Sequence, residues 1–160
     1  MFGLSKNRGI DQEIEAVKSK QSELEKMIAS LEANQPRRFG IPEQVIELRQ
    51  GEEYAGIVLG KENEPSYHLI LLPDEAEKIN WANALKWAAS VGGYLPSRRD
   101  QAMLYANLKE QFKEAWYWSS EQYAENADYA WVQYFLNGNQ GSYLKDGEWR
   151  ARAVRRLVIQ

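Results

Sequence analysis

The stretch IDQEIEAVKSKQSELEKMIASL, from Ile10 to Leu31, decides how this chain is organised. Its apolar residues recur in alternating steps of four and three, the spacing that lets helices wind around one another in a coiled coil. The seam consists of Ile10, Ile14, Val17, Gln21, Leu24, Ile28 and Leu31, and Gln21 is its one polar member. The sequence therefore predicts a coiled-coil oligomerisation helix over residues 10–35.

The charged residues beside this seam favour parallel association of identical chains. With Ile14 at an a position of the heptad, Glu13 and Lys20 occupy g positions. The e positions five residues later are Lys18 and Glu25, so each g residue meets an opposite charge on a parallel neighbour.

The seam leaves the number of strands open. Isoleucine at a with leucine at d favours dimers, while a buried polar layer can shift that preference. The alternative to a coiled coil is one amphipathic helix packed against its own domain, but such a helix usually has a wider apolar face than this seam.

Length, charge and composition limit the class of protein. At 160 residues the chain can hold one well-buried domain and a stalk, but is too short for two ordinary domains. Its net charge of -3 and the lack of a long basic stripe give no electrostatic footprint for nucleic acid. The chain contains no cysteine, which excludes disulfides, thiolate catalysis and cysteine-ligated metals.

The first residues give no sign of export. Met1–Gly9 lacks the apolar run of a secretion signal, and no later segment has the roughly 18 uninterrupted apolar residues of a membrane span. We therefore expect a protein made in a cytoplasm, without a signal peptide or membrane insertion. Residues 1–9 are expected to form an N-terminal tail.

A linker or collar is predicted over residues 36–50, after the helix. Pro36, Gly40 and Pro42 prevent a continuous helix there. Within this segment, Glu43–Arg49 is ambiguous between a short helix and a strand.

A β-hairpin is predicted next. Tyr54–Leu59 and Tyr67–Leu72 are rich in strand-forming residues, and the polar turn Gly60–Ser66 separates them. Pro73 is expected to close the second strand.

Two helices and further strands complete the pattern. Asn80 is a predicted cap for a helix that ends at the pair Gly92 and Gly93, and Ser97 with Asp100 forms the capping pattern of a second helix. The stripe of the second helix contains Leu104, Leu108 and Phe112. Short extended runs follow at Tyr117–Ser119, Ala130–Leu136, Gly141–Leu144 and Ala151–Ile159. This order of strands, helices and strands predicts an α+β fold.

Several short motifs, in their order and spacing, resemble the Lcl C-terminal-like family. They are Gly93–Arg98 (GYLPSR), Trp116–Ser120 (WYWSS), the set Trp131, Phe135, Asn137 and Gly138, and Arg152–Arg155 (RAVR). This family is similar to the C-type lectin-like fold, and many members look like phage or prophage proteins. The resemblance covers Gly51–Val158.

The resemblance implies a C-type lectin-like domain over residues 51–160. In that fold the first and last strands meet, two helices flank the sheet, and a long irregular loop region presents a ligand surface. Relatives include phage tail-fibre tips and proteins on trimeric stems, which favours a homotrimer over a dimer. Ala153 replaces a cysteine that many members have, and the Glu-Pro-Asn and Trp-Asn-Asp strings of calcium-dependent lectins are missing. Accordingly, we expect no metal and no cofactor.

The aromatic and polar residues of the last third predict a ligand-binding surface. Large rings give contact area at little entropic cost, and short polar side chains add adjustable hydrogen bonds. The predicted site residues are Tyr123, Tyr129, Tyr134, Asn139, Gln140, Tyr143 and Trp149. The family's framework positions, Trp116, Trp118, Trp131 and Phe135, are assigned to the core instead.

No catalytic arrangement is predicted. The only histidine, His68, lies in an apolar strand and is expected to be structural and hydrogen-bonded. Three acids, Asp74, Glu75 and Glu77, are expected just before a helix, near its positive end. The arginines of the last strand are expected to pair with nearby acids; they are Arg150, Arg152, Arg155 and Arg156.

These observations lead to one functional prediction and one alternative. The prediction is a non-enzymatic phage or prophage virion protein whose coiled coil displays several lectin-like heads toward a host cell-surface protein or glycan. The alternative is a structural virion component, in the capsid decoration, baseplate or tail, whose head packs on neighbouring virion proteins. The predicted location is the virion in both cases.

Overall fold

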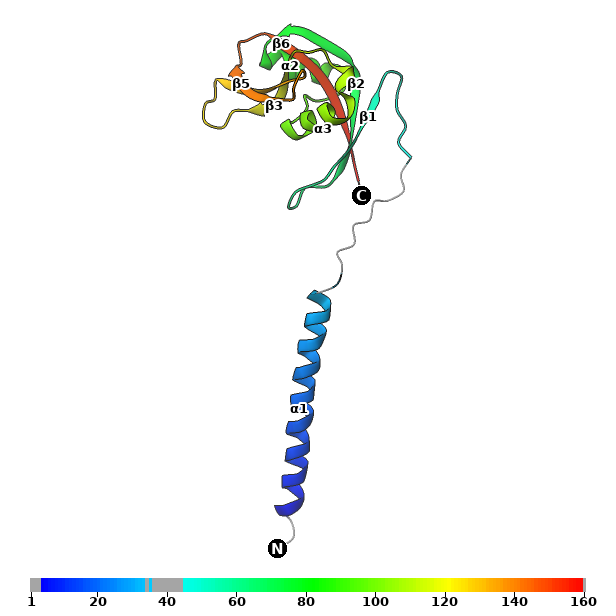
Figure 1. Ribbon diagram of the computed structural model, residues 1–160, viewed down its shortest axis with the longest axis vertical. Helices are drawn as coiled ribbons and strands as arrows, with labels where there is room; N and C mark the ends of the chain where they lie inside the picture. The colour runs from blue at the N-terminus through cyan, green and yellow to red at the C-terminus, as the bar shows by residue number, and fades with distance from the viewer. Residues whose placement is uncertain (1–3, 34, 36–44, 160) are drawn as a thin grey trace. The chain divides into compact units, whose positions relative to one another are not determined.

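The computed structural model describes residues 4–33, 35 and 45–159, and it divides the chain into two compact units (Figure 1). The units are Met1–Glu43 and Gln44–Gln160. Residues 1–3 of the predicted tail and residues 36–44 of the predicted linker lie outside the described residues. Residues 45–49, where the sequence left helix and strand open, form neither.

Among the described residues, the first unit contains one helix, α1, over Leu4–Ala33. It begins earlier than predicted and takes in residues 4–9, which the sequence assigns to the tail. The apolar side chains of the seam are exposed, from 46% for Ile14 to 64% for Val17. One helix alone cannot bury them, so association with further copies stays a prediction.

The second unit is a mixed α/β fold built on a six-stranded sheet. The strand order is β1-β2-β6-β3-β4-β5, and the pairing of β3 with β6 is parallel. The strands are β1 (Glu53–Val58), β2 (Tyr67–Ile79), β3 (Trp116–Gln122), β4 (Tyr129–Tyr134), β5 (Gln140–Leu144) and β6 (Trp149–Val158). The helices are α2 (Trp81–Ser90) and α3 (Arg98–Leu108), followed by the short 3₁₀ helix η1 (Lys109–Gln111).

Each face of the sheet has its own apolar core. On one face, Leu104 and Leu108 of α3 pack with Tyr117 and Phe135. On the other face, Ala84 and Ala88 of α2 pack with a set that includes Trp118. Because successive side chains of a strand point to opposite faces, neighbours such as Tyr117 and Trp118 belong to different cores. The prediction that two helices flank the sheet is confirmed.

The pairing of the last strand differs from what the resemblance implies. The first strand, β1, pairs with β2 at the edge of the sheet, whereas β6 lies inside it between β2 and β3. The expected meeting of the first and last strands is therefore wrong: β6 meets β2.

The prediction that Pro73 closes the second strand is also wrong. Strand β2 is 13 residues long and continues past Pro73 to Ile79, and its pairing with β6 is irregular between Leu71 and Glu75. Proline is tolerated in a strand at such an irregularity, where its missing N–H leaves no gap in the ladder. As a result Asp74, Glu75 and Glu77 lie in a strand rather than at the positive end of a helix.

Both predicted helix caps are confirmed. The Asn80 side chain accepts a hydrogen bond from the Asn83 N–H, and Ser97 and Asp100 form a reciprocal capping box. Helix α3 ends at Leu108, so Phe112 lies beyond it, although its ring still packs on the core of the α3 face.

Three of the four arginines of β6 pair with acids, as predicted. Arg150 pairs with Glu75 and Glu77, Arg155 with Glu52, and Arg156 with Asp100. Arg152 contradicts the prediction, because its guanidinium donates to the carbonyl oxygens of Gln111 and Leu72 at 2.6 and 2.9 Å.

The buried hydroxyl of Tyr117 predicts a loss of stability at alkaline pH. Burial raises the pKa of Tyr117 to about 12, from an ordinary value of 10.0, and the side chain is only 1% exposed. The folded chain keeps a proton that the unfolded chain loses, so this stabilisation is complete below pH 10.0 and is lost as the pH rises to about 12. Two pKa units correspond to about 2.7 kcal/mol.

A Tyr117→Phe variant removes this group. Its unfolding free energy should fall less steeply between pH 10.0 and about 12 than that of the unmodified protein, as measured by urea unfolding at a series of pH values. Part of the decline remains, since the pKa of Tyr67 is also raised to about 12, by burial and by its bond to Asp100. An unchanged slope would contradict the assignment to Tyr117.

Candidate ligand-binding surface

Four aromatic side chains from four strands form a continuous row on the α2 face of the sheet. Tyr134 of β4 and Trp116 of β3 are cross-strand partners whose rings stack at 4.9 Å between centroids. Trp116 also contacts Tyr143 of β5 at 5.2 Å, and Tyr143 contacts Trp149 of β6 at 5.1 Å. We call Tyr134, Trp116, Tyr143 and Trp149 the aromatic row.

Strand alternation explains why the row is half-buried. Trp116 lies two residues before Trp118, and Tyr134 two residues after Val132, so each shares a face with a buried core residue. Trp118 and Val132 are completely buried in the core beneath α2. The four rings of the row are only partly covered. The row is thus an accessible aromatic surface that borders the buried core on the α2 face of the sheet.

A hollow of about 360 Å³ lies beside this row and has a charged rim. We call it the first hollow. Three rings of the row, Trp116, Tyr134 and Trp149, line it together with Ala115. Its charged residues are Glu77, Lys78, Glu114, Glu148 and Arg150.

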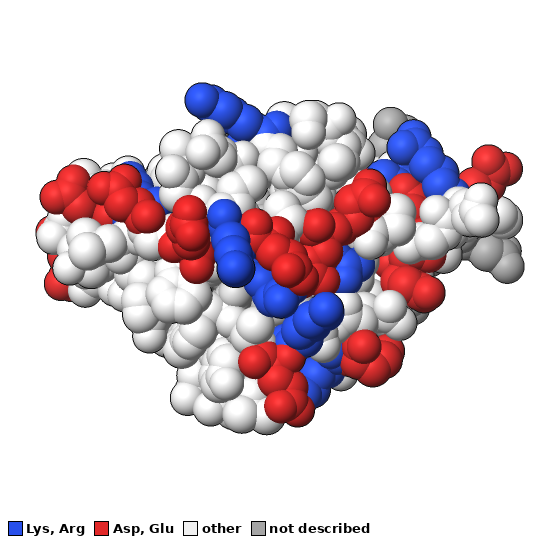
Figure 2. Space-filling model, turned by 90° about the horizontal axis from the view of Figure 1, so that it is seen from above, with Lys and Arg blue, Asp and Glu red and all other residues white. Residues whose placement is uncertain are grey.

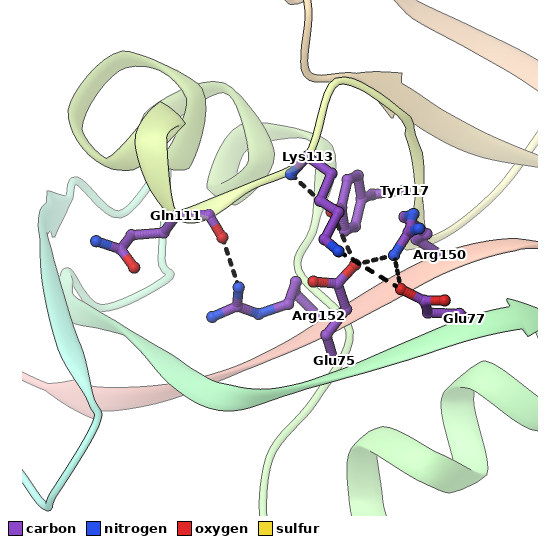
Figure 3. Close-up of polar contacts among 7 residues, drawn as sticks. All are labelled: Glu75, Glu77, Gln111, Lys113, Tyr117, Arg150 and Arg152. Atoms are coloured by element: carbon purple, nitrogen blue, oxygen red, sulfur yellow. Dashed lines mark hydrogen bonds and ion pairs between the residues drawn. The ribbon is translucent and has the colours of Figure 1, made fainter.

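An ion-pair network holds one wall of the first hollow in place (Figure 3). The Arg150 guanidinium donates to Glu75 Oε1 at 2.6 Å and also to Glu77. The Tyr117 hydroxyl donates to the same Glu75 oxygen at 3.0 Å. Hydrogen bonds to Glu77 and Glu75 raise the pKa of Arg150, and the bond from Arg150 lowers the pKa of Glu77. Both groups therefore stay charged at neutral pH. The positive charge of Arg150 is balanced by the carboxylates of Glu75 and Glu77.

A second hollow, of about 460 Å³, adjoins the row on the side of β5. No charged side chain lines it, within the part of the chain that the structure describes. Its lining consists of Tyr129, Ser142, Tyr143, Leu144, Gly147 and Trp149. Trp149 lines both hollows. Tyr129, Ser142 and Leu144 alternate along their strands with the residues of the row, so the second hollow lies at the edge of the sheet formed by β5.

The predicted site residues separate into two groups. Tyr134, Tyr143 and Trp149 belong to the aromatic row, and Tyr129 lines the second hollow beside them. The structure adds Trp116 to this group, although the sequence assigns it to the core.

The other predicted site residues lie elsewhere. The Tyr123 ring packs edge-on against Trp131 at 5.4 Å, on the face opposite the row. The Gln140 side chain is held by Arg98 at 2.9 Å and by Gln133 at 2.8 Å. Asn139 is exposed, and its carbonyl oxygen accepts a bond from the Tyr134 N–H. These three residues are not brought together with the aromatic row.

The assignment of four framework aromatics to the core is only partly correct. Trp118 and Phe135 are buried, at 0% and 1% exposed. Trp116 and Trp131 are half-buried. The guanidinium of Arg98 lies 3.6 Å from the centre of the Trp131 ring and covers it.

The charged rim of the first hollow was not predicted from the sequence. Glu75 and Glu77 are two residues apart, which is the strand period, and this spacing was the available signal that both point the same way. Because the strand was expected to end at Pro73, this strand spacing was not applied to Glu75 and Glu77. Glu114 and Glu148 lie beside strand ends, where no local pattern links them to the aromatic row.

The structure also bears on His68, on metal binding and on membrane insertion. His68 is 4% exposed, and its Nδ1 lies 3.0 Å from the Tyr54 hydroxyl, so the expected hydrogen bond is confirmed. Among the described residues, no three His, Asp or Glu side chains are close enough together to hold a metal ion. The described helices also include none with the length and apolar character of a membrane span.

The charges on the surface have both signs. Acidic and basic side chains interleave across the face of the described residues that Figure 2 shows, without a broad basic area.

A scan against protein-family models finds no match for this chain, and a search of curated proteins also finds none.

Proposed function

We propose that this protein is a non-enzymatic homo-oligomer that displays C-type lectin-like heads and binds a receptor on a host cell surface through the aromatic row. The observation that carries the proposal is the continuity of Tyr134, Trp116, Tyr143 and Trp149 across four strands, half-exposed and flanked by two hollows.

Physical chemistry supports a binding role for such a surface. Rings held in place by their neighbours lose little conformational entropy when a ligand covers them, so their contact area contributes efficiently to affinity. A contiguous exposed apolar patch on a protein surface is typical of an interaction site or a ligand-binding groove. The hydrogen-bonded wall formed by Glu75, Glu77 and Arg150 adds fixed polar groups at its border.

The proposed lectin-like fold and the proposed location in a virion are supported by the sequence motifs. A mixed sheet with one helix on each face is compatible with the C-type lectin-like fold that these motifs resemble. The phage or prophage virion follows from the same resemblance.

Oligomerisation through α1 suits this role. The seven seam positions lie along one helix, and their apolar side chains are exposed. Tethered copies of a modest site bind a repetitive surface with an avidity that can exceed the affinity of one site by about 100-fold. We propose a parallel homotrimer.

Adhesion to intact host cells tests the proposal. A Tyr143→Ala variant should reduce cell binding by about tenfold or more, because it interrupts the row between Trp116 and Trp149. Tyr123→Ala is the matched control, since this ring lies on the opposite face, and it should adhere normally. The measurement is binding of fluorescently labelled protein to cells, with circular dichroism to show that both variants are folded.

Two outcomes would change the conclusion. Full adhesion by the Tyr143→Ala protein would show that the row is not the receptor site. If the unmodified protein does not adhere to host cells at all, the alternative of a structural virion component is supported, with the row as its contact with a neighbouring subunit.

A further inference from the structure

We infer that strand β5 binds its partner by strand addition, in which an extended, uncharged segment of a host-surface protein pairs with the outer edge of β5. The inference rests on the proposed function, because it names a protein as the receptor of the surface to which Tyr143 belongs. It follows from the direction of the main-chain groups of β5, from the composition of this strand and from the uncharged hollow beside it.

Strand β5 lies at one edge of the sheet, and β4 is its one neighbour among the described strands (Figure 1). Two bonds at its ends fix the pairing. The Tyr134 N–H donates to the Asn139 carbonyl at 2.8 Å, and the Lys145 N–H donates to the Asp128 carbonyl at 2.9 Å. In an antiparallel pair, residues that bond to the neighbouring strand alternate with residues that turn away from it. Because Asn139 and Lys145 both face β4, every second residue between them also faces it.

The remaining residues of β5 turn their main-chain N–H and C=O groups out of the sheet; they are Gln140, Ser142 and Leu144. The Leu144 carbonyl accepts a bond from the Gly147 N–H at 2.9 Å, and the pairing with β4 does not use the other groups of these three residues. The edge therefore presents donors and acceptors at the spacing of alternate strand residues, about 6.8 Å. An extended backbone has the matching pattern, which identifies an extended peptide as the ligand.

The opposite edge of the sheet, β1, is protected against such pairing. It has a bulge at Ala55, whose carbonyl accepts a bond from the Asn107 side chain at 2.7 Å. The Leu59 carbonyl, just beyond β1, accepts a bond from the Arg99 guanidinium at 2.6 Å. Proteins commonly use bulges, charged residues and proline to keep an edge strand from pairing with another chain. The five residues of β5, all described, include no charge, no proline and no bulge, so this edge is open to a partner strand.

The second hollow gives the added strand a place for an apolar side chain. It has a volume of about 460 Å³, and its described lining is uncharged. Leu144, which lines it, is 54% exposed. Side chains of an added strand alternate between the two faces, so residues opposite Tyr143 and Leu144 would lie beside this hollow. In strand addition the main-chain bonds supply affinity and such pockets select the side chains, so we expect a large apolar residue here.

A second copy of this chain fits the edge less well than a strand of different sequence. Two β5 strands paired about Ser142 would set Leu144 against Gln140. The Gln140 amide is held by Arg98 at 2.9 Å and by Gln133 at 2.8 Å, so a fixed polar group would face the exposed leucine. This pairing buries no apolar side chain against Leu144, which favours a foreign strand.

Titration of the isotopically labelled full chain with a defined peptide tests the inference. The probe is the heptapeptide Thr-Val-Thr-Leu-Thr-Val-Thr, blocked at both ends. Its control is the same peptide with N-methyl groups on the three central residues, which blocks both of its edges. The probe should shift the main-chain amide signals of Ser142 and Leu144 in nuclear magnetic resonance spectra. It should also bind at least about tenfold more tightly than the methylated peptide.

Variants of the edge assign the binding to β5. Ser142→Pro removes an outward N–H and keeps the bonds of β5 to β4, because proline is tolerated where the N–H of an edge strand faces solvent. It should weaken both peptide binding and cell adhesion by about tenfold or more, whereas Ser142→Ala keeps the N–H and should weaken them far less. Circular dichroism checks that each variant is folded.

A charge on the edge provides a second variant that does not alter the main chain. Leu144→Lys, at a position that is 54% exposed, places an ammonium group beside the uncharged hollow and should also weaken binding by about tenfold. Leu48→Lys is the control for the added charge, since Leu48 precedes β1 and is 44% exposed, and it should bind normally.

Treatment of the host cells identifies the class of receptor. Protease digestion of the cell surface should remove adhesion, because the partner strand belongs to a protein. Periodate oxidation of surface sugars should leave adhesion in place.

The outcomes separate this inference from the proposed function. If the heptapeptide does not bind, if Ser142→Pro binds as well as Ser142→Ala, or if periodate but not protease removes adhesion, strand addition is wrong. The aromatic surface still stands in that case, provided that Tyr143→Ala reduces adhesion. If the peptide binds and Ser142→Pro weakens it, but the unmodified protein does not adhere to cells, strand addition stands and its role in adhesion is wrong. A lower native mass for Ser142→Pro would show that a second copy occupies the edge, which would also overturn the inference.

Discussion

Replacing Ile14 and Ile28 by aspartate is expected to reduce the native mass of this protein to that of one chain. Both residues occupy a positions of the predicted coiled coil, where their side chains would be buried between helices. Two carboxylates per chain at these positions would be brought together without partners, a cost that the remaining seam cannot offset. Loss of multivalency should also weaken adhesion to cells about 100-fold.

The control carries the same added charge on the outer side of the helix. Ser19→Asp with Ser30→Asp should leave the native mass unchanged, because neither residue belongs to the seam. A truncated chain beginning at Arg37 should be monomeric and keep the melting temperature of the head. A single-chain mass for the unmodified protein, or an unchanged mass for the seam variant, would overturn the coiled coil.

Asp100→Ala is expected to lower the stability of the head by about 4 kcal/mol. The Asp100 side chain is completely buried, and it accepts bonds from the Ser97 N–H at 2.8 Å and the Tyr67 hydroxyl at 2.6 Å. It also pairs with Arg156. One substitution thus removes half of a capping box and leaves three donors without their acceptor.

Thermal unfolding followed by circular dichroism measures this effect. A loss of this size should lower the melting temperature by about 15 °C or more. Asp100→Asn keeps the shape and one acceptor and should lose less, while Glu110→Ala, at an exposed position, should change the melting temperature little. A decrease below about 1 kcal/mol for Asp100→Ala would show that Asp100 does not stabilise the head through these donors.

Local signals allowed much of the fold to be predicted. The caps at Asn80 and Ser97 are contacts between residues three apart, so they can be predicted from the sequence without knowledge of the tertiary structure. The hairpin of β1 and β2 was likewise predictable because its turn and both strands are adjacent in sequence.

Features that depend on distant residues were not predictable in this way. Strand β2 passes through Pro73 because β6, much later in the chain, accommodates the irregularity. Trp116 and Trp118 lie on the same face of β3, so alternation along the strand could not show that only Trp118 is completely buried beneath α2. The pairing of β3 with β4 shifts after Trp118, and this irregularity prevents simple alternation from placing Tyr123 on its face.

The position of β6 has a consequence for biosynthesis. Every other strand and helix of the head is translated before β6, yet β6 joins β2 to β3 at the centre of the sheet. Closing this long stretch of chain is slow compared with forming local contacts. On the ribosome, therefore, α1 is complete while the head still lacks its central strand, so the proposed association of chains through α1 would begin before the heads mature.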